Sequence, residues 1–356
     1  MKLASWSLHV YRLRYAREVV WANEIESAGT YALLQLAADN GAKGVAEGTL
    51  KPTWTGFSPG SLLCALQDIF IPRLKSLQLE DETSIEKAFA GIPENRLPKA
   101  MIGNACWTLR AAAAGKPLWQ LWGCDPAVPV TFTVTRQKPA RMAAEAAEVC
   151  ARHGFRHLKV KGGQGIATDL QALKEIRAAV GPGVELTVDA NSEYPREEAP
   201  AYVRALAEAG VAAAEDPSRL APDAAFEKMQ AESAIPILVD RTCASREDAA
   251  LYLERGARAL STKPARVGLS EARAVAALAA RRAAKTAVGI YAESLLGTLI
   301  SLQQPGTMAA EQTFYLGMLE QITDFALPIE KGKVRLPSIA DFSALVDWDR
   351  VRRYAV

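Results

Sequence analysis

Three acidic residues close short apolar runs whose spacing matches successive units of one repeating fold. Glu215 lies 26 residues after Asp189, and Asp240 lies 25 residues after Glu215. A strand with its following helix and turns takes about that many residues, so the three carboxylates are expected at the ends of consecutive parallel strands. Carboxylates that close repel one another unless a cation lies among them. Ligation by oxygen alone favours Mg²⁺, with Mn²⁺ possible, over Zn²⁺.

Lysines flank these acids on both sides. In the run from His157 to Lys161, apolar side chains alternate with Lys159 and Lys161, which puts both ammonium groups on the inner face if the apolar face meets helices. Lys263 lies 23 residues after Asp240 and belongs to the next strand. A single acid at a strand end is about as often a helix N-cap or an ion-pair partner. The combination of acids, spacing and lysines favours a metal site between two lysine positions.

The elements that position these residues follow a regular rhythm from Val128 onward. The predicted strands are Val130–Thr135, Arg156–Lys161, Val184–Asp189, Val211–Glu215, Ile235–Asp240, Ala257–Ser261 and Thr286–Ile290. Seven such units without a glycine-rich nucleotide fingerprint favour a (β/α) barrel over a doubly wound open sheet. The glycine-rich stretch Gly162–Gly165 fits no phosphate-binding motif and predicts a tight turn.

The first 125 residues have a different character. A candidate strand at Tyr31–Ala37 and helical segments around Gly60–Leu77 and Pro98–Ala114 predict an α+β domain over residues 1–125. Residues 126–325 form the predicted catalytic barrel. The segment 326–356 does not continue the barrel rhythm, and we expect it to return to the first domain.

The composition is that of an ordinary globular protein. The chain has 356 residues, a net charge of +2 and no runs of basic residues, so we expect no nucleic-acid partner. No stretch of about 20 apolar residues occurs, which argues against a membrane partner. The first residues lack the apolar segment of a signal peptide, and a cytoplasmic location is expected. Five scattered cysteines predict reduced, buried thiols.

Several motifs resemble those of the enolase superfamily, specifically its muconate lactonizing enzyme subgroup. The motifs are Lys159–Lys161, Val188–Asn191, Ala214–Pro217, Val239–Asp240 and Thr262–Gly268. Gly44–Glu47 and Ala114–Gly123 are similar to signatures of that family's capping domain, and Ala292–Thr298 is similar to its eighth-strand segment. The resemblance implies an α/β fold: a TIM-like (β/α)7β barrel with an N-terminal α+β capping domain that the C-terminal tail completes.

The resemblance also implies roles for the site residues. Mg²⁺ would be held by Asp189, Glu215 and Asp240. A small carboxylate substrate would bind that metal and pass through an enolate, with Lys161 as general base and Lys159 supporting the carboxylate. Lys263 would act as the acid or base on the opposite face, or as an electrostatic partner only. Asn191 and Glu293 would contact the substrate, and the family's habit implies a homo-oligomer.

Other positions narrow the range of reactions that the resemblance implies. The histidines are His9, His153 and His157. None of them lies at or beyond the fifth predicted strand, where a histidine base of the kind found in related racemases and dehydratases would be expected. His157 is expected to be a satisfied core residue. Ala292–Ser294 lacks the Asp-x-Asp of dipeptide epimerases. Arg241 stands directly after Asp240, where the family usually has a glutamate.

Two capping-domain loops set specificity in such enzymes, and they correspond here to about Tyr15–Gly29 and Thr49–Ser61. Within the second loop, Trp54 and Phe57 are predicted to close over the ligand and bind the substrate. Aromatic residues in a loop bearing Gly and Pro otherwise serve packing alone.

We therefore expect removal of a proton next to a carboxylate, first as a muconate cycloisomerase-like reaction. Racemisation or epimerisation of an N-acylamino acid, or dehydration as in o-succinylbenzoate synthesis, are alternatives within the same chemistry. A different class stays open, because Arg241 could mark a non-catalytic relative that binds a metal and a carboxylate without turnover.

Overall fold

The chain begins with a three-stranded antiparallel sheet of order β1-β2-β3. The computed structural model describes residues 1–20, 25–304 and 306–356. The strands are β1 (Leu3–Val20), β2 (Ile25–Ala38) and β3 (Lys43–Thr49). The predicted strand Tyr31–Ala37 is confirmed inside β2. The predicted loop Tyr15–Gly29 is wrong, because its described residues pair as the ends of β1 and β2; residues 21–24 lie outside the described residues.

Helices cover one face of this sheet. They are α1 (Pro52–Thr55), α2 (Pro59–Cys64), a π-helical turn (Ala65–Phe70), α3 (Ile71–Leu74), α4 (Glu82–Ala90), α5 (Arg96–Ala114) and α6 (Leu118–Leu121). Both predicted helical segments are confirmed. Helix α5 lies so close to β3 that a side chain at Gly44 would meet the carbonyl oxygen of Ala105 at 2.0 Å. Alternate residues of β2, such as Leu34 and Leu36, are buried against these helices.

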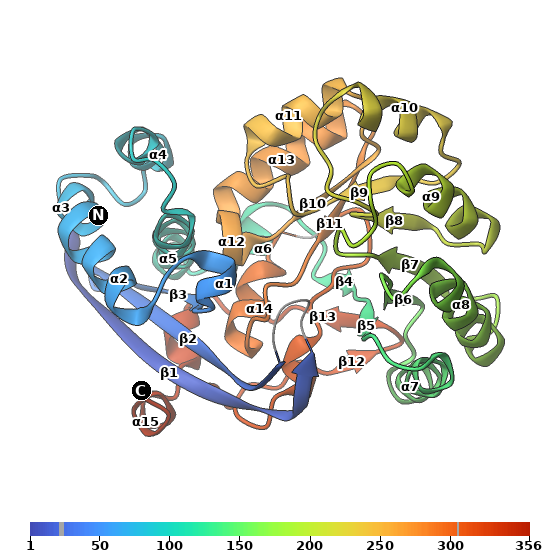
Figure 1. The fold of residues 1–356 in the computed structure, drawn as a ribbon. Helices are drawn as coiled ribbons and strands as arrows, with labels where there is room; N and C mark the ends of the chain where they lie inside the picture. Colours follow the sequence, from blue (N-terminus) through green and yellow to red (C-terminus); the bar gives the residue numbers. More distant parts are fainter. Residues whose placement is uncertain (21–24, 305) are drawn as a thin grey trace.

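A seven-stranded parallel sheet of order β11-β10-β9-β8-β7-β6-β5 forms the larger part of the molecule. Its strands are β5 (Phe132–Val134), β6 (His157–Lys161), β7 (Glu185–Asp189), β8 (Ala213–Glu215), β9 (Ile237–Val239), β10 (Ala259–Thr262) and β11 (Lys285–Val288). Each overlaps one of the predicted strands, so the prediction of seven successive parallel units is confirmed. Figure 1 shows the sheet curled into a half-barrel with its helices outside.

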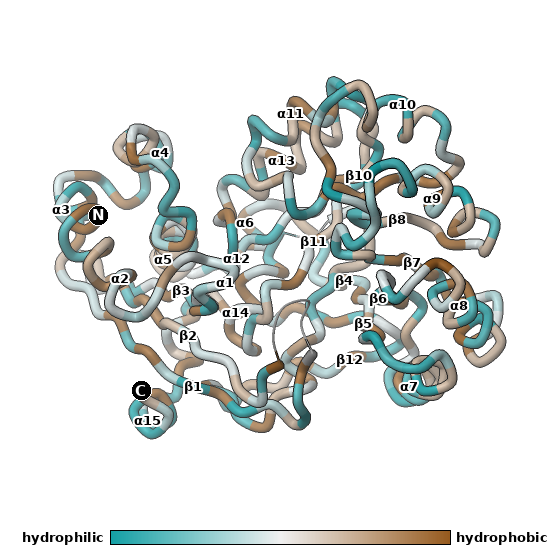
Figure 2. Tube along the Cα trace, viewed as in Figure 1, coloured by the Kyte–Doolittle hydropathy of each residue, from teal (hydrophilic) through white to brown (hydrophobic). Residues whose placement is uncertain are grey.

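Helices follow these strands, and most of them lie on the outer face of the sheet (Figure 1). They are α7 (Pro139–His153), α8 (Ile166–Val180), α9 (Ala199–Glu208), α10 (Ala224–Glu232), α11 (Arg246–Glu254), α12 (Pro264–Val267), α13 (Leu269–Arg281) and α14 (Leu295–Ser301). The apolar side chains of Leu158 and Val160 are buried in the core beneath them, as their alternation with the lysines predicts. In Figure 2 hydrophobic residues run along β7 and β8. The stretch Gly162–Gly165 forms the turn between β6 and α8.

An extended segment, residues 307–311, lies between the two edge strands of the half-barrel. On one side its backbone N–H groups at Met308 and Glu311 donate to carbonyls of β11. On the other side the Ala310 carbonyl accepts from Thr131, next to β5. The segment therefore joins the edges of the curled sheet, and it carries Glu311 to the same end as the predicted ligands.

The end of the chain packs against its beginning. A small antiparallel sheet joins β12 (Ile329–Glu330), β13 (Lys333–Arg335) and β4 (Ala127–Pro129). After α15 (Trp348–Arg353), the Tyr354 carbonyl accepts from the Arg12 amide, and the Val356 amide donates to Val10 in β1. Within the described residues, no helix combines the length and apolar character needed to cross a membrane.

The cysteines correct one expectation. Cys106 and Cys243 are buried, but Cys64 is exposed, and Cys124 and Cys150 are partly accessible. All five are free thiols. The prediction of reduced thiols agrees with this, whereas the prediction that all are buried is wrong, because Cys64 closes α2 on the outer surface.

Candidate active site

The carboxyl ends of β6, β7 and β8 form a ladder of charged residues. Strand register places Lys161 beside Asp189 and Asp189 beside Glu215. The next strand, β9, is followed directly by Asp240, and Lys263 follows β10. Parallel strands align their carboxyl ends at one edge, so residues far apart in the sequence meet there. The structure thus brings the three predicted acids and the predicted lysines to one end of the sheet.

Lys159 lies deepest among the lysines and contacts several carboxylates. Its Nζ is 2.8 Å from Glu215, 2.7 Å from Glu311 and 3.3 Å from Asp189. Its side chain is only 5% exposed, against 21% for Lys161. Burial alone would lower the pKa of Lys159, but the carboxylates of Glu215 and Glu311 raise it well above the ordinary value. Lys159 therefore remains an ammonium group that holds the acids in place.

Lys161 reaches the same acids from a more accessible position. Its Nζ is 2.6 Å from Asp189 Oδ2 and 4.0 Å from Glu311. Burial would raise the pKa of Asp189, but Lys161 and Lys159 hold it well below its usual range. Among the lysines at this edge, Lys161 is the most exposed, which is what contact with a substrate proton requires.

Lys263 approaches from the opposite flank. Its Nζ lies 2.5 Å from Asp240 Oδ2, and Arg266 donates to the backbone carbonyl of Asp240. Burial opposes ionisation of Asp240, but Lys263 and Arg266 keep its pKa low. A Cβ added at Gly289 would lie 2.7 Å from Lys263 Cε, so alanine there would displace the lysine side chain.

Glu311 is a site residue that the sequence-based analysis missed. Its carboxylate accepts from Lys159 and from the Thr133 hydroxyl. Burial would raise its pKa, but Lys159 and Lys161 lower it. The extended segment that carries it is too short to be assigned as a strand, so no apolar run marked the position in the sequence.

The predicted metal ligands are turned towards lysines in this structure. Within residues 1–20, 25–304 and 306–356, no group of three or more Asp, Glu, His and Cys side chains is arranged to hold a metal ion. The donor atoms nonetheless suit a hard cation. Asp240 Oδ1 is buried and accepts no hydrogen bond, and burial, with the Asp189 carboxylate, raises the pKa of Glu215 well above its ordinary value. The oxygen donors therefore fit Mg²⁺, which would have to displace lysine contacts.

The predicted substrate-binding residues differ in their surroundings. Asn191 adopts a left-handed backbone (φ 52°) and donates to Asp189 from its amide and its side chain. Glu293 is buried and accepts from the Tyr291 amide and from Ser301. Glu293 also accepts from the Gln312 side-chain amide, and substrate contact by Asn191 and Glu293 stays a prediction.

Two further expectations change. His157 is not a core residue: its side chain is 33% exposed, and its Nδ1 lies 3.4 Å from Glu185 Oε1. It begins β6, so it lies at the opposite end of the strand from Lys161. Arg241 is exposed, and its backbone amide donates to the Asp216 carboxylate. The Arg241 side chain therefore does not intrude among the carboxylates.

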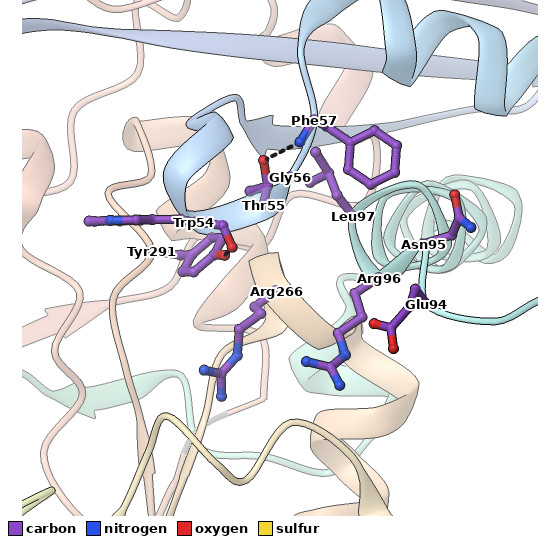
Figure 3. A pocket seen from close by; sticks show the side chains of 10 residues that line it. All are labelled: Trp54, Thr55, Gly56, Phe57, Glu94, Asn95, Arg96, Leu97, Arg266 and Tyr291. Carbon is purple, nitrogen blue, oxygen red and sulfur yellow. Dashed lines mark hydrogen bonds between the residues drawn. The ribbon is translucent and has the colours of Figure 1, made fainter. Parts of the chain in front are cut away.

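A cavity of about 440 Å³ lies beside the Lys263 flank. Trp54 and Phe57 both line it, as do Tyr291 and Arg266 (Figure 3). The Tyr291 hydroxyl donates to the Trp54 carbonyl, and the two rings lie 5.5 Å apart. The predicted lid residues thus border a space next to the charged cluster, and their closure over a ligand stays a prediction.

Comparisons with known proteins agree with this geometry. The family described as enolase C-terminal domain-like matches residues 141–341, more than half of the chain. An N-succinylamino acid racemase from Thermus thermophilus is 29% identical over 328 residues, which cover 88% of this chain and 86% of the relative. An o-succinylbenzoate synthase from Geobacillus kaustophilus is 30% identical over 302 residues, covering 81% and 78%.

Solved structures share the whole fold. A muconate lactonizing enzyme from Pseudomonas fluorescens superposes with a TM-score of 0.91 at 21% identity, covering 100% of this chain and 99% of the other. The curled parallel sheet with acids and lysines at its strand ends, together with these matches, shows that the chain belongs to the enolase superfamily, in its muconate lactonizing enzyme subgroup. The chain is therefore an enzyme, an isomerase or a lyase of this superfamily.

Proposed function

We propose that the enzyme removes a proton from the carbon next to a substrate carboxylate, with Lys161 as the base. The observation that carries this proposal is the placement of Lys161 and Lys263 on opposite flanks of the acids, each within 2.6 Å of an aspartate. The substrate can lose its proton to one lysine acting as a neutral amine, and the planar intermediate that results can gain a proton on its other face from the ammonium group of the second lysine.

The carboxylates of Asp189, Glu215 and Asp240 would hold Mg²⁺. When bound, the ion would supply Lewis-acid stabilisation of the charge that develops on the substrate carboxylate. Lys159 keeps Glu215 and Glu311 oriented, and the accessible Lys161 takes the proton. Lys263 faces the same space from the other flank, where it can return a proton or stabilise negative charge.

Within this chemistry, a muconate cycloisomerase-like reaction is our first candidate, supported by the subgroup to which the chain belongs. The second candidate is racemisation of an N-acylamino acid. It is favoured by the matched pairing of the two lysines with Asp189 and Asp240, because a racemase needs an acid and a base on opposite faces. The similarity to an N-succinylamino acid racemase points the same way.

Hydrogen exchange at the α-carbon in D₂O with added Mg²⁺ tests the proposal on a panel of N-acylamino acids and of the lactones formed from muconates. Lys161→Met should reduce α-hydrogen exchange by at least about 100-fold, because general base catalysis contributes roughly that much. Lys174→Met is the matched control, since Lys174 is exposed on α8. Full exchange in Lys161→Met would refute the proposed base.

The Lys263→Met variant separates the two candidates. If exchange and racemisation both need Lys263, the racemase is supported. If a muconate turns over and only Lys161 is needed for exchange, the cycloisomerase is supported. A panel without any Mg²⁺-dependent exchange would contradict both.

A further inference from the structure

The glycine-rich turn Gly162–Gly165 follows Lys161 directly and joins β6 to α8. Two of its residues adopt backbone conformations that favour glycine, with φ of 86° at Gly163 and 100° at Gly165. Turns of this kind direct successive backbone N–H groups into one concave space, which suits an anion. In this protein the anion is a side chain of the same chain.

That anion is the carboxylate of Asp169, in the first turn of α8. Its Oδ2 accepts from the Gly163 amide at 2.8 Å, and its Oδ1 accepts from the Gln164 amide at 3.1 Å. Asp169 is only 3% exposed, and a buried carboxylate is stable only where donors surround it. A Cβ added at Gly162 would lie 2.8 Å from Asp169 Oδ2, so the turn packs directly on the carboxylate.

Two tyrosine hydroxyls bind the same carboxylate from the next strand–helix unit. Tyr194, on the loop after β7, donates to Asp169 Oδ2 at 2.6 Å, and Tyr202, on α9, donates at 2.8 Å. Burial, together with the Asp169 carboxylate, raises the pKa of both tyrosines, so both hydroxyls keep their protons and remain donors. Asp169 therefore joins the turn after Lys161 to the loop that carries Asn191.

Arg136 holds the same turn and loop through their carbonyl groups. Its Nε donates to the Gly162 carbonyl at 2.6 Å, and its Nη2 donates to the Ala190 carbonyl at 3.3 Å. Its Nη1 lies 3.1 Å from Glu193 Oε1. Because Arg136 comes from the segment between β5 and α7, its guanidinium joins three consecutive units of the barrel.

The turn and the loop begin at residues of the proposed reaction. Lys161 is the last residue of β6, and Asp189 is the last residue of β7. The two are paired in register, and the Gly162 amide donates to the Asp189 carbonyl at 2.9 Å. A residue at a strand end is held by the ladder on one side only. The segment that follows must therefore fix its position on the other side.

We propose that Asp169 and Arg136 are positioning residues for Lys161, because together they hold the turn that keeps its ammonium group against Asp189. The carboxylate binds N–H groups of the turn and the guanidinium binds carbonyl groups, so each charge supports a different half of the contacts. A neutral side chain of similar size at either position would lose these charge-assisted hydrogen bonds. The consequence for catalysis rests on the proposed function, since it takes Lys161 as the base.

Chemical labelling of lysines tests the positioning without a substrate or a metal. The full chain in EDTA is treated with a small amount of acetic anhydride, and fragment mass spectra measure acetylation at Lys161 and Lys263. Asp169→Asn and Arg136→Gln should each raise labelling of Lys161 at least about fivefold, which is the factor that one lost hydrogen bond represents. Lys263 lies on the other flank and should be labelled at its original rate.

Asp223→Asn is the matched control, because Asp223 accepts from the Phe226 amide at the start of α10 and lies outside the turn. It should leave the labelling of both lysines unchanged. Tyr194→Phe removes a single hydrogen bond to Asp169 and should also raise labelling of Lys161, so it replaces Asp169→Asn if that variant does not fold. Unchanged labelling of Lys161 in the variants would overturn the proposal. An equal rise at Lys161 and Lys263 would also overturn it, because it would show general loosening of the fold.

Hydrogen exchange at the α-carbon then tests the consequence for catalysis. On a substrate that the unsubstituted enzyme exchanges, Asp169→Asn should lower kcat roughly 10- to 100-fold with little change in KM, because a misplaced base weakens the transition state more than substrate binding. An unchanged kcat would overturn this consequence. If no substrate is exchanged although Lys161 labelling responds as expected, the proposed function is wrong and the positioning of Lys161 by Asp169 and Arg136 is retained.

Discussion

Substitution of Lys159 tests the charge balance of the site most directly. Its ammonium group lies within 3.3 Å of three buried carboxylates, those of Asp189, Glu215 and Glu311. Lys159→Met keeps the length and the apolar stem of the side chain but removes the charge. In the variant the three carboxylates stay close together, but the ammonium group that lay among them is gone.

The cheapest response of the variant is to protonate one of these acids. A glutamate such as Glu311 has an ordinary pKa of about 4.3, which is roughly 2.7 units below pH 7. Holding a proton at pH 7 costs about 1.36 kcal/mol for each of these units. The expected loss of unfolding free energy is therefore about 3.7 kcal/mol. Breaking other buried ion pairs costs a similar amount, about 3–5 kcal/mol.

Urea unfolding in EDTA at pH 7 and pH 5 measures this loss. The deficit should shrink by about 2.7 kcal/mol at pH 5, because the solution then supplies the proton more readily. Lys174→Met, on the exposed face of α8, should change stability by no more than about 0.5 kcal/mol. A Lys159→Met variant as stable as this control at pH 7 would refute the reasoning. Added Mg²⁺ should stabilise Lys159→Met more than the unsubstituted protein, because one competing ammonium group is gone.

Other residues give predictions that are measured more simply. Asp189→Asn should weaken Mg²⁺ binding by roughly 100-fold in calorimetry, since it removes a charged oxygen ligand; unchanged affinity would contradict the proposed ligand set. Burial raises the pKa of Glu47, so the protein should lose stability as pH rises from about 4.3 through that raised pKa. Glu47→Gln removes the titrating group, so between pH 5 and pH 8 its melting temperature should rise relative to that of the unsubstituted protein. A difference in melting temperature that stays constant over this range would contradict the prediction. In a thiol titration at pH 8, Cys64 should react in the folded protein, whereas Cys106 and Cys243, whose pKa burial raises to about 12, should react only after unfolding.

The sequence was sufficient for the repeating part of the fold. The alternation of Leu158 and Val160 with the lysines reflects a local property, the two-residue period of a strand. The spacing from Asp189 to Glu215 and Asp240 reflects the length of one strand–helix unit. Because both signals depend only on short stretches of the chain, the seven strands could be predicted, and so could the edge of the sheet at which the acids lie.

Contacts between distant segments were decided by the tertiary structure. Glu311 meets Lys159 from 152 residues away, and its short extended segment has no apolar run of its own. Arg96 and Arg266 share one cavity only because the N-terminus of α5 packs beside α12. The long pairing of β1 with β2 likewise replaced a predicted loop, because the exposed Arg14 pairs with the buried Ala28 in one continuous hairpin.

The sequence by itself therefore determined the class of protein and the strand-end positions of Asp189, Glu215, Asp240 and the lysines. The tertiary structure decided which charges face each other: Lys159 with Glu311, Lys263 with Asp240, and two arginines around one space. The physical reason is that strand period and unit length act within about 25 residues, whereas ion pairing and burial depend on where the folded chain brings remote segments together.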